Sequence, residues 1–363
     1  MTPYQQLESA FRQAALIDEA SSFLSWDASV NMPDKSAESR AEQLATLGVL
    51  SHHTLTRPEI AEWIDAAGGS NVVLDPWQRA NLREMRRVWV HRAAVPADLV
   101  AAMARADSAC EMVWREAKPS GDFAAVLPKL TEVLRLVRES AEAKAPKLGT
   151  GLYDALLDQF EAGGRAADID PIFADLGAFL PGAIDRSIVH QAAHPALAPQ
   201  GPFPVERQRE LSLALMRRIG FPFEQGRLDV SRHPFSGGTP DDLRITTRYD
   251  EEDFARALMG TLHETGHAMY EAGLPKAWRR QPVGEARGMV MHESQSLLLE
   301  MQACRSREFI SFAAPLMREK LGGEGAAWDA DNLHRLGIRV ARSFIRVDAD
   351  EITYPCHVIL RYR

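Results

Sequence analysis

The sequence predicts a mainly α-helical protein with a small β element directly before a helix that carries the motif H-E-x-x-H. Apolar residues recur at three- and four-residue spacing from residue 1 to about 180, as in "LPKLTEVLRLVRESAEA". This spacing is typical of helices with one buried face. After Arg227 the pattern changes to short alternating runs, which favour strands.

Each element is predicted by a local signal. "MTPYQQLESAFRQAAL" has the pattern of an amphipathic helix rather than that of a signal peptide. The proline- and alanine-rich stretch 181–204 is expected to be a long connection, after which Pro204 opens a helix that Gly220 can close. "RLDVS" and "DLRITTRY" are expected to be strands around a turn-rich segment, with Arg244 and Thr246 on the polar face of the second.

Composition limits the possible partners. The 363 residues are 45% hydrophobic, enough for a large core in one or two domains. The net charge is −8 with acids and bases interleaved, which argues against nucleic acid as the main partner, and no apolar run is long enough to span a membrane. Cys110, Cys304 and Cys356 form no C-x-x-C pair, so we expect free thiols and a cytoplasmic protein.

The H-E-x-x-H motif consists of His263, Glu264 and His267. On a helix the two histidines lie four residues apart on one face, so both imidazoles can bind one metal ion. Glu264 could then hold a water bound to that ion, because zinc lowers the pKa of water and the glutamate takes its proton. The alternative is a pair of surface histidines on a solvated helix face.

A third metal ligand has to come from elsewhere in the chain. The metzincin class requires glycine and histidine where this chain has Tyr270 and Gly273, so that class is excluded. The alternative is a glutamate from a second helix, with Glu285, Glu293 and Glu300 as candidates. We choose Glu293, since it lies in the apolar helical run "MVMHESQSLLLEMQ", where a carboxylate is costly unless paired or metal-bound. Glu285 lies in a loop-like stretch, and Glu300 has the pattern of a helix-face residue.

"HETGHAMYEAGLP" followed by "HESQSLLLE" resembles the M32 family of metallocarboxypeptidases. The family's other motifs occur in the same order, and "FLSWDASVNMP" and "SRAEQLATL" are similar to its N-terminal region. The further motifs are "HPF" at 233–235, "DLRIT" at 242–246 and "IRVDAD" at 345–350. The resemblance covers the whole chain.

This resemblance implies a gluzincin-like helical fold with a deep active-site cleft, usually in a homodimer. It also implies an enzyme that removes residues one at a time from peptide C-termini. It also implies a set of site residues. The metal ligands would be His263, His267 and Glu293, and the general base would be Glu264.

Recognition of a free C-terminal carboxylate favours arginine, whose planar fork can donate two parallel hydrogen bonds. We assign Arg346 to the carboxylate and Arg244 to the lining of the cleft, and the alternative for each is a salt bridge, such as one between Arg244 and Asp242.

His233 in "HPF" could polarise the scissile carbonyl or cap a turn. By the resemblance, the "HPF" motif helps to close the far end of the substrate cleft. Asp348 and Asp350 could orient a ligand imidazole or be solvated helix acids.

We therefore expect one metallopeptidase domain over 1–363, with a helical part at about 1–200 and a metal-site part at about 201–363, lacking the C-terminal segment of the family's proteins. The expected protein is a zinc-dependent carboxypeptidase, with cobalt as a second possible metal, and it acts on peptides with a free C-terminus. Two alternatives stay open: a metalloendopeptidase, and a catalytically impaired metal-binding protein that acts by association with another chain.

Overall fold

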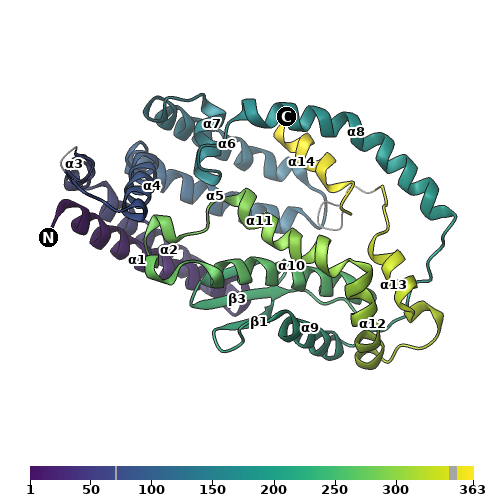
Figure 1. The fold of residues 1–363 in the computed structure, drawn as a ribbon. Helices are drawn as coiled ribbons and strands as arrows, with labels where there is room; N and C mark the ends of the chain where they lie inside the picture. Colours follow the sequence, from purple (N-terminus) through teal and green to yellow (C-terminus); the bar gives the residue numbers. More distant parts are fainter. Residues whose placement is uncertain (70–71, 343–349) are drawn as a thin grey trace. The chain divides into compact units, whose positions relative to one another are not determined.

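The computed structural model describes residues 1–69, 72–342 and 350–363. Over these residues the chain is mainly helical and contains one three-stranded sheet, which confirms the predicted fold class (Figure 1). No helix in the described part is both long enough and apolar enough to cross a lipid bilayer.

The chain divides into two compact units, which are residues 1–165 with 274–289, and residues 166–273 with 290–363. In the described residues, the first unit contains long helices and three short 3-10 helices. Its elements are α1 (Pro3–Val30), η1 (Asp34–Ser36), α2 (Ala37–Thr56), α3 (Pro58–Ala67), α4 (Pro76–Ala93), α5 (Ala97–Ala117), α6 (Phe123–Leu148), α7 (Leu152–Phe160), η2 (Lys276–Trp278) and η3 (Pro282–Gly284).

The first unit includes the segment 274–289, which follows the rest of the unit by more than 100 residues in the sequence. Fully buried Asn81 of α4 holds this segment: its Nδ2 donates to Gln281 Oε1 at 3.1 Å, and its Oδ1 accepts from the backbone N–H of Val283 at 3.2 Å. The segment therefore packs with helices that precede it by about 200 residues.

The second unit contains the sheet and the helices with the predicted metal ligands. Its elements are α8 (Ala166–Ala192), α9 (Val205–Ile219), β1 (Gly226–Val230), β2 (Ser236–Thr239), β3 (Asp242–Thr247), α10 (Phe254–Gly273), α11 (Met289–Leu297), the π-helical segment η4 (Leu298–Cys304), α12 (Arg307–Leu321), η5 (Ala326–Trp328), α13 (Ala330–Gly337) and α14 (Tyr354–Tyr362).

One helix boundary differs from the sequence predictions, and one agrees with them. Helix α8 continues to Ala192 with Pro181 inside it, although 181–204 was expected to be a connection. A proline removes one backbone donor, and the rest of the helix still forms its hydrogen bonds. Helix α9 ends as predicted, at a left-handed Gly220 with φ 97°.

The sheet has the order β1-β3-β2, with β1 parallel and β2 antiparallel to β3. Strand β2 lies in the segment that the sequence predicted as turns. The alternation predicted for β3 fails at Thr246, which is fully buried. Its hydroxyl accepts hydrogen bonds from Ser231 Oγ at 2.7 Å and from the backbone N–H of Phe235 at 3.0 Å, and these offset the cost of burying a polar group.

Helix α10 is buried on two sides, and this fixes the orientation of its remaining face. Leu258 and Leu262 pack into a core with α9 and α12, whereas Ala268 packs with Leu243 and Ile245 of β3. In Figure 1, α10 lies between β3 and α11. The face that is turned towards α11 carries the H-E-x-x-H histidines.

Candidate metal centre

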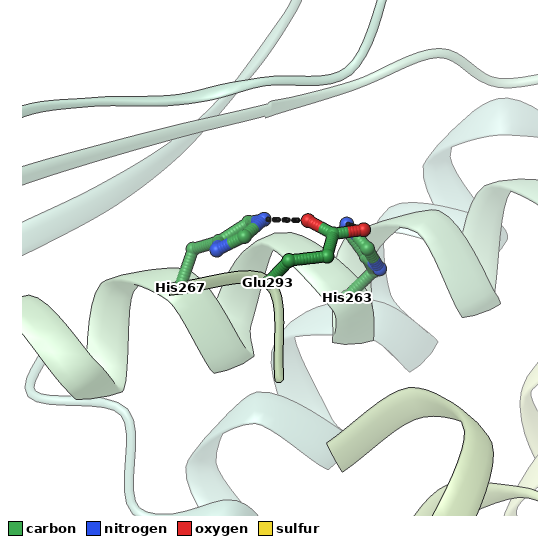
Figure 2. Close-up of side chains that lie close together, drawn as sticks. All are labelled: His263, His267 and Glu293. Atoms are coloured by element: carbon green, nitrogen blue, oxygen red, sulfur yellow. Dashed lines mark ion pairs between the residues drawn. The ribbon is translucent and has the colours of Figure 1, made fainter. Parts of the chain in front are cut away.

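Three side chains converge between α10 and α11. His263 and His267 come from α10 and Glu293 from α11, and one ligand atom of each lies within 4.8 Å of the others. Glu293 Oε2 is 3.3 Å from His267 Nε2, and Glu293 Oε1 is 3.9 Å from His263 Nε2. Figure 2 shows the carboxylate between the two rings, with its ion pair to His267 drawn as a dashed line.

This donor set fits a divalent metal ion. Two neutral imidazole nitrogens and one carboxylate oxygen are the protein ligands of a catalytic zinc site, which keeps a further position open. The structure thus brings together the three residues that the sequence selected, and of the three candidate glutamates only Glu293 reaches both imidazole Nε2 atoms in the described part of the chain.

The two helices approach each other closely at Gly266, inside the motif. A Cβ atom placed on Gly266 would lie 2.6 Å from Ser296 Cα and 2.8 Å from the backbone oxygen of Gln295. Such distances are too short for any side chain, so a glycine is required here. The contact brings the α11 backbone against α10 beside His267.

Both imidazoles have a hydrogen-bond partner at Nδ1. His263 Nδ1 lies 3.0 Å from Glu300 Oε2. His267 Nδ1 lies 3.1 Å from the backbone oxygen of His292 and 2.6 Å from the Nδ1 of its ring, whose Nε2 is 2.8 Å from Glu271. With Nδ1 occupied in this way, each ring presents Nε2 to the carboxylate of Glu293, which is the arrangement that metal binding needs.

Glu264 is 7% exposed, and burial raises the pKa of its carboxyl, while the neighbouring His263 and His267 oppose this shift. A glutamate with a raised pKa holds a proton more readily near neutral pH, which suits a general base.

In contrast to Glu264, the carboxyl groups of Glu293 and Glu300 have lowered pKa values. The hydrogen bond from His267 lowers the pKa of Glu293 more than burial raises it. Burial would raise the pKa of Glu300, but the hydrogen bond to His263 and the charge of Arg305 together lower it. Both carboxylates are therefore held in the charged form that pairs with imidazole or metal.

Two of the three predicted substrate-binding residues, Arg244 and His233, lie in the described part of the chain. Arg244 makes a bidentate ion pair with Asp242, at 2.7 and 2.8 Å, which was the alternative left open for it. His233 is exposed, and its backbone oxygen accepts a hydrogen bond from Ser231 Oγ at 2.5 Å. Arg346 lies outside the described residues.

The carboxylate beside His263 Nδ1 belongs to a residue for which the sequence had not suggested this role. Asp350 accepts hydrogen bonds from Ala341 and Thr353, in its own segment, and Asp348 lies outside the described residues. Instead Glu300, which is only 8% exposed, contacts His263. A signal for this was present, because Glu293 and Glu300 are seven residues apart and so share one helix face.

Comparisons with known proteins agree with this geometry. The sequence profile of the family described as "Carboxypeptidase Taq (M32) metallopeptidase" matches residues 6–363. "Thermostable carboxypeptidase 1" of Thermus thermophilus is 39% identical, over 99% of this chain and 73% of its own length. "Carboxypeptidase 1" of Bacillus subtilis is 32% identical, over 95% and 68%.

Solved structures show the same fold. The Trypanosoma cruzi metallocarboxypeptidase 1 matches with a TM-score of 0.94 and 39% identity, over 99% of this chain and 72% of that chain. An M32 carboxypeptidase from Deinococcus radiodurans matches with a TM-score of 0.87 and 32% identity, over 99% and 72%.

Proposed function

The chain belongs to the Carboxypeptidase Taq (M32) metallopeptidase family, whose members are peptide hydrolases, and on this premise we propose that it is a zinc-dependent carboxypeptidase. The substrate would be a peptide with a free C-terminal carboxylate, and the bond broken would be its last peptide bond. The observation that carries the proposal is the convergence of His263, His267 and Glu293 beside the buried carboxylate of Glu264.

The metal ligands and Glu264 have different roles in the proposed reaction. His263, His267 and Glu293 would hold the ion, which when bound supplies Lewis-acid chemistry by polarising the peptide carbonyl and acidifying water. Glu264 accepts a proton from the attacking water and returns it to the amine nitrogen as the peptide bond breaks. Because this carboxyl is buried, its raised pKa makes it a stronger base for the first of these transfers.

We assign the substrate carboxylate to Arg346 and the lining of the cleft to Arg244 and His233. The ion pair with Asp242 supports this division, since it occupies Nε and Nη2 of Arg244, one complete edge of the guanidinium. Because Arg244 is already ion-paired, it is suited to lining the cleft with a fixed surface. Arg346 would then donate the two hydrogen bonds to the substrate carboxylate.

Metal identity, assembly and location complete the proposal. Two imidazoles and a carboxylate suit zinc, and cobalt accepts the same donors. A homodimer is inferred from the family resemblance, and a cytoplasmic location from the cysteine pattern. Metal analysis of the purified protein, sedimentation velocity and cell fractionation test these three points separately.

The central test is the release of amino acids from defined peptides. An unblocked peptide and an N-terminally blocked one should both lose C-terminal residues, a C-terminally amidated one should not, and a chelator should stop the reaction. Glu264→Gln should lower kcat/KM by about 10²- to 10⁴-fold with zinc still bound. Glu319→Gln, an exposed glutamate of α12, is the matched control and should not change it.

Two outcomes would point to the alternatives. Equal cleavage of the amidated peptide would identify an endopeptidase. Stoichiometric zinc without hydrolysis of any of these peptides would identify a metal-binding protein without peptidase activity.

A further inference from the structure

We propose that Glu300 is a positioning residue, which holds the proton of His263 on Nδ1 and so keeps Nε2 available to the metal. The proposal rests on the proposed function, because it assigns a further residue to the same metal centre. Glu300 would act through the imidazole of His263, which it contacts at Nδ1.

The first observation is the contact itself. Glu300 is 8% exposed, and its Oε2 lies 3.0 Å from His263 Nδ1. A carboxylate is only an acceptor, so the shared proton belongs to the imidazole. In the neutral ring a proton on Nδ1 leaves the lone pair on Nε2, the atom that lies 3.9 Å from Glu293.

The second observation is that Arg305 occupies the other oxygen of the same carboxylate. Arg305 Nη2 donates to Glu300 Oε1 at 2.6 Å, and Nη1 donates to the backbone oxygen of Gly337 at 2.9 Å. Glu300 is thus fixed from both ends, by two donors that each require an acceptor. A donor in place of the oxygen beside Arg305 would break that bond, and a donor in place of the oxygen beside His263 would reverse the other.

The third observation is the local backbone. Glu300 lies in the π-helical segment η4, which directly follows α11. Helices α10 and α11 run antiparallel, since Glu293 lies beside His267 and Glu300 beside His263. Short π-helical insertions are rare and concentrate at functional sites, and here the insertion includes the residue that contacts the first histidine.

These contacts predict a specific effect of Glu300→Gln. The glutamine amide has one acceptor and one donor end, and the guanidinium of Arg305 can only donate. The amide oxygen therefore turns to Arg305 and the amide NH2 to His263. His263 must then accept at Nδ1, which moves its proton to Nε2, the nitrogen that the metal requires.

The experiment measures zinc binding and the tautomer rather than activity. Zinc affinity is obtained by competition with a fluorescent chelator, and the tautomer by ¹⁵N NMR of the metal-free protein at alkaline pH, where imidazole is neutral. In the parent the His263 proton should be on Nδ1. In Glu300→Gln it should be on Nε2, and the zinc Kd should rise by about 10- to 100-fold.

Two further variants separate positioning from general stability. Asp158→Asn breaks a buried histidine–carboxylate pair of similar kind, between Asp158 Oδ2 and His91 Nε2 at 2.7 Å, in the other compact unit, and it should leave the zinc Kd unchanged. In the double variant Glu300→Gln with Arg305→Met, the amide oxygen is released to face His263. This variant should bind zinc more tightly than Glu300→Gln alone.

Several results would overturn the proposal. A parent protein with the His263 proton on Nε2 would do so even if Glu300→Gln failed to fold. A zinc Kd within about twofold of the parent in Glu300→Gln, or an equal rise in Asp158→Asn, would do so as well. Absence of peptidase activity in a parent that binds zinc would instead count against the proposed function, and would leave these measurements intact.

Discussion

Gly266 determines how closely α10 and α11 approach each other, and Gly266→Ala tests whether this approach positions Glu293. The new Cβ would lie 2.6 Å from Ser296 Cα, where ordinary carbon contacts begin at about 3.5 Å. The nearest atoms are backbone and cannot rotate away. Relief therefore requires the two helices to separate by about 0.9 Å at this point.

A displacement of this size exceeds what a metal site tolerates, since ligand distances have to hold to within about 0.2 Å. We expect the zinc Kd of Gly266→Ala to rise at least about 10-fold and kcat/KM to fall about 100-fold. Overpacking should also lower the free energy of unfolding by about 1–3 kcal/mol, offset by about 1 kcal/mol from the higher helix propensity of alanine.

Gly260→Ala in the same helix is the matched control. Its Cβ would lie 3.8 Å from Pro234 Cγ, an ordinary contact, and it gains the same helix propensity. Chelator competition and peptide hydrolysis are measured on both variants. If Gly266→Ala binds zinc as tightly as Gly260→Ala, the close approach does not position the third ligand and the reasoning is refuted.

Three further predictions follow from burial. In the metal-free protein the pKa of Glu264 should lie above 4.5, and zinc should lower it, because a nearby cation favours the carboxylate. As the pH falls, Glu264 should therefore become protonated at a higher pH without zinc than with it. A ¹³C NMR titration that finds the same pKa with and without zinc would contradict this. Leu262→Ala truncates a fully buried side chain and should lower the free energy of unfolding in urea by about 2.7–5 kcal/mol, whereas an effect below about 1 kcal/mol would mean that α10 is not part of the core as described. Asn81→Leu leaves the Val283 N–H and the Gln281 side chain without this partner, and should cost about 1–3 kcal/mol in the same measurement; unchanged stability would show that the 274–289 segment is held by other contacts.

The sequence predicted the features that depend on neighbouring residues. The i, i+4 spacing places His263 and His267 on one face of any helix. The apolar run of α11 did not predict its burial, since Met289, Val290 and Met291 are 55%, 68% and 45% exposed. Proline and glycine signals located both ends of α9. The same kind of signal failed at Pro181, because a proline weakens a helix locally without always ending it.

The choice among acidic residues required contacts between segments. Periodicity left Glu285, Glu293 and Glu300 as candidates, and it could not say that Glu293 meets both imidazoles while Glu300 meets the opposite nitrogen of one. The pairing of Arg244 with Asp242 was also only one of two possibilities until the strand was placed.

What the sequence by itself determined is the helical class and the placing of His263, Glu264 and His267 on one helix, because these follow from the spacing of residues along the chain. What only the tertiary structure decided is which carboxylate lies at each imidazole nitrogen. That outcome depends on the antiparallel approach of α11 to α10 at Gly266, and a distance between two helix surfaces is not encoded in the period of either one.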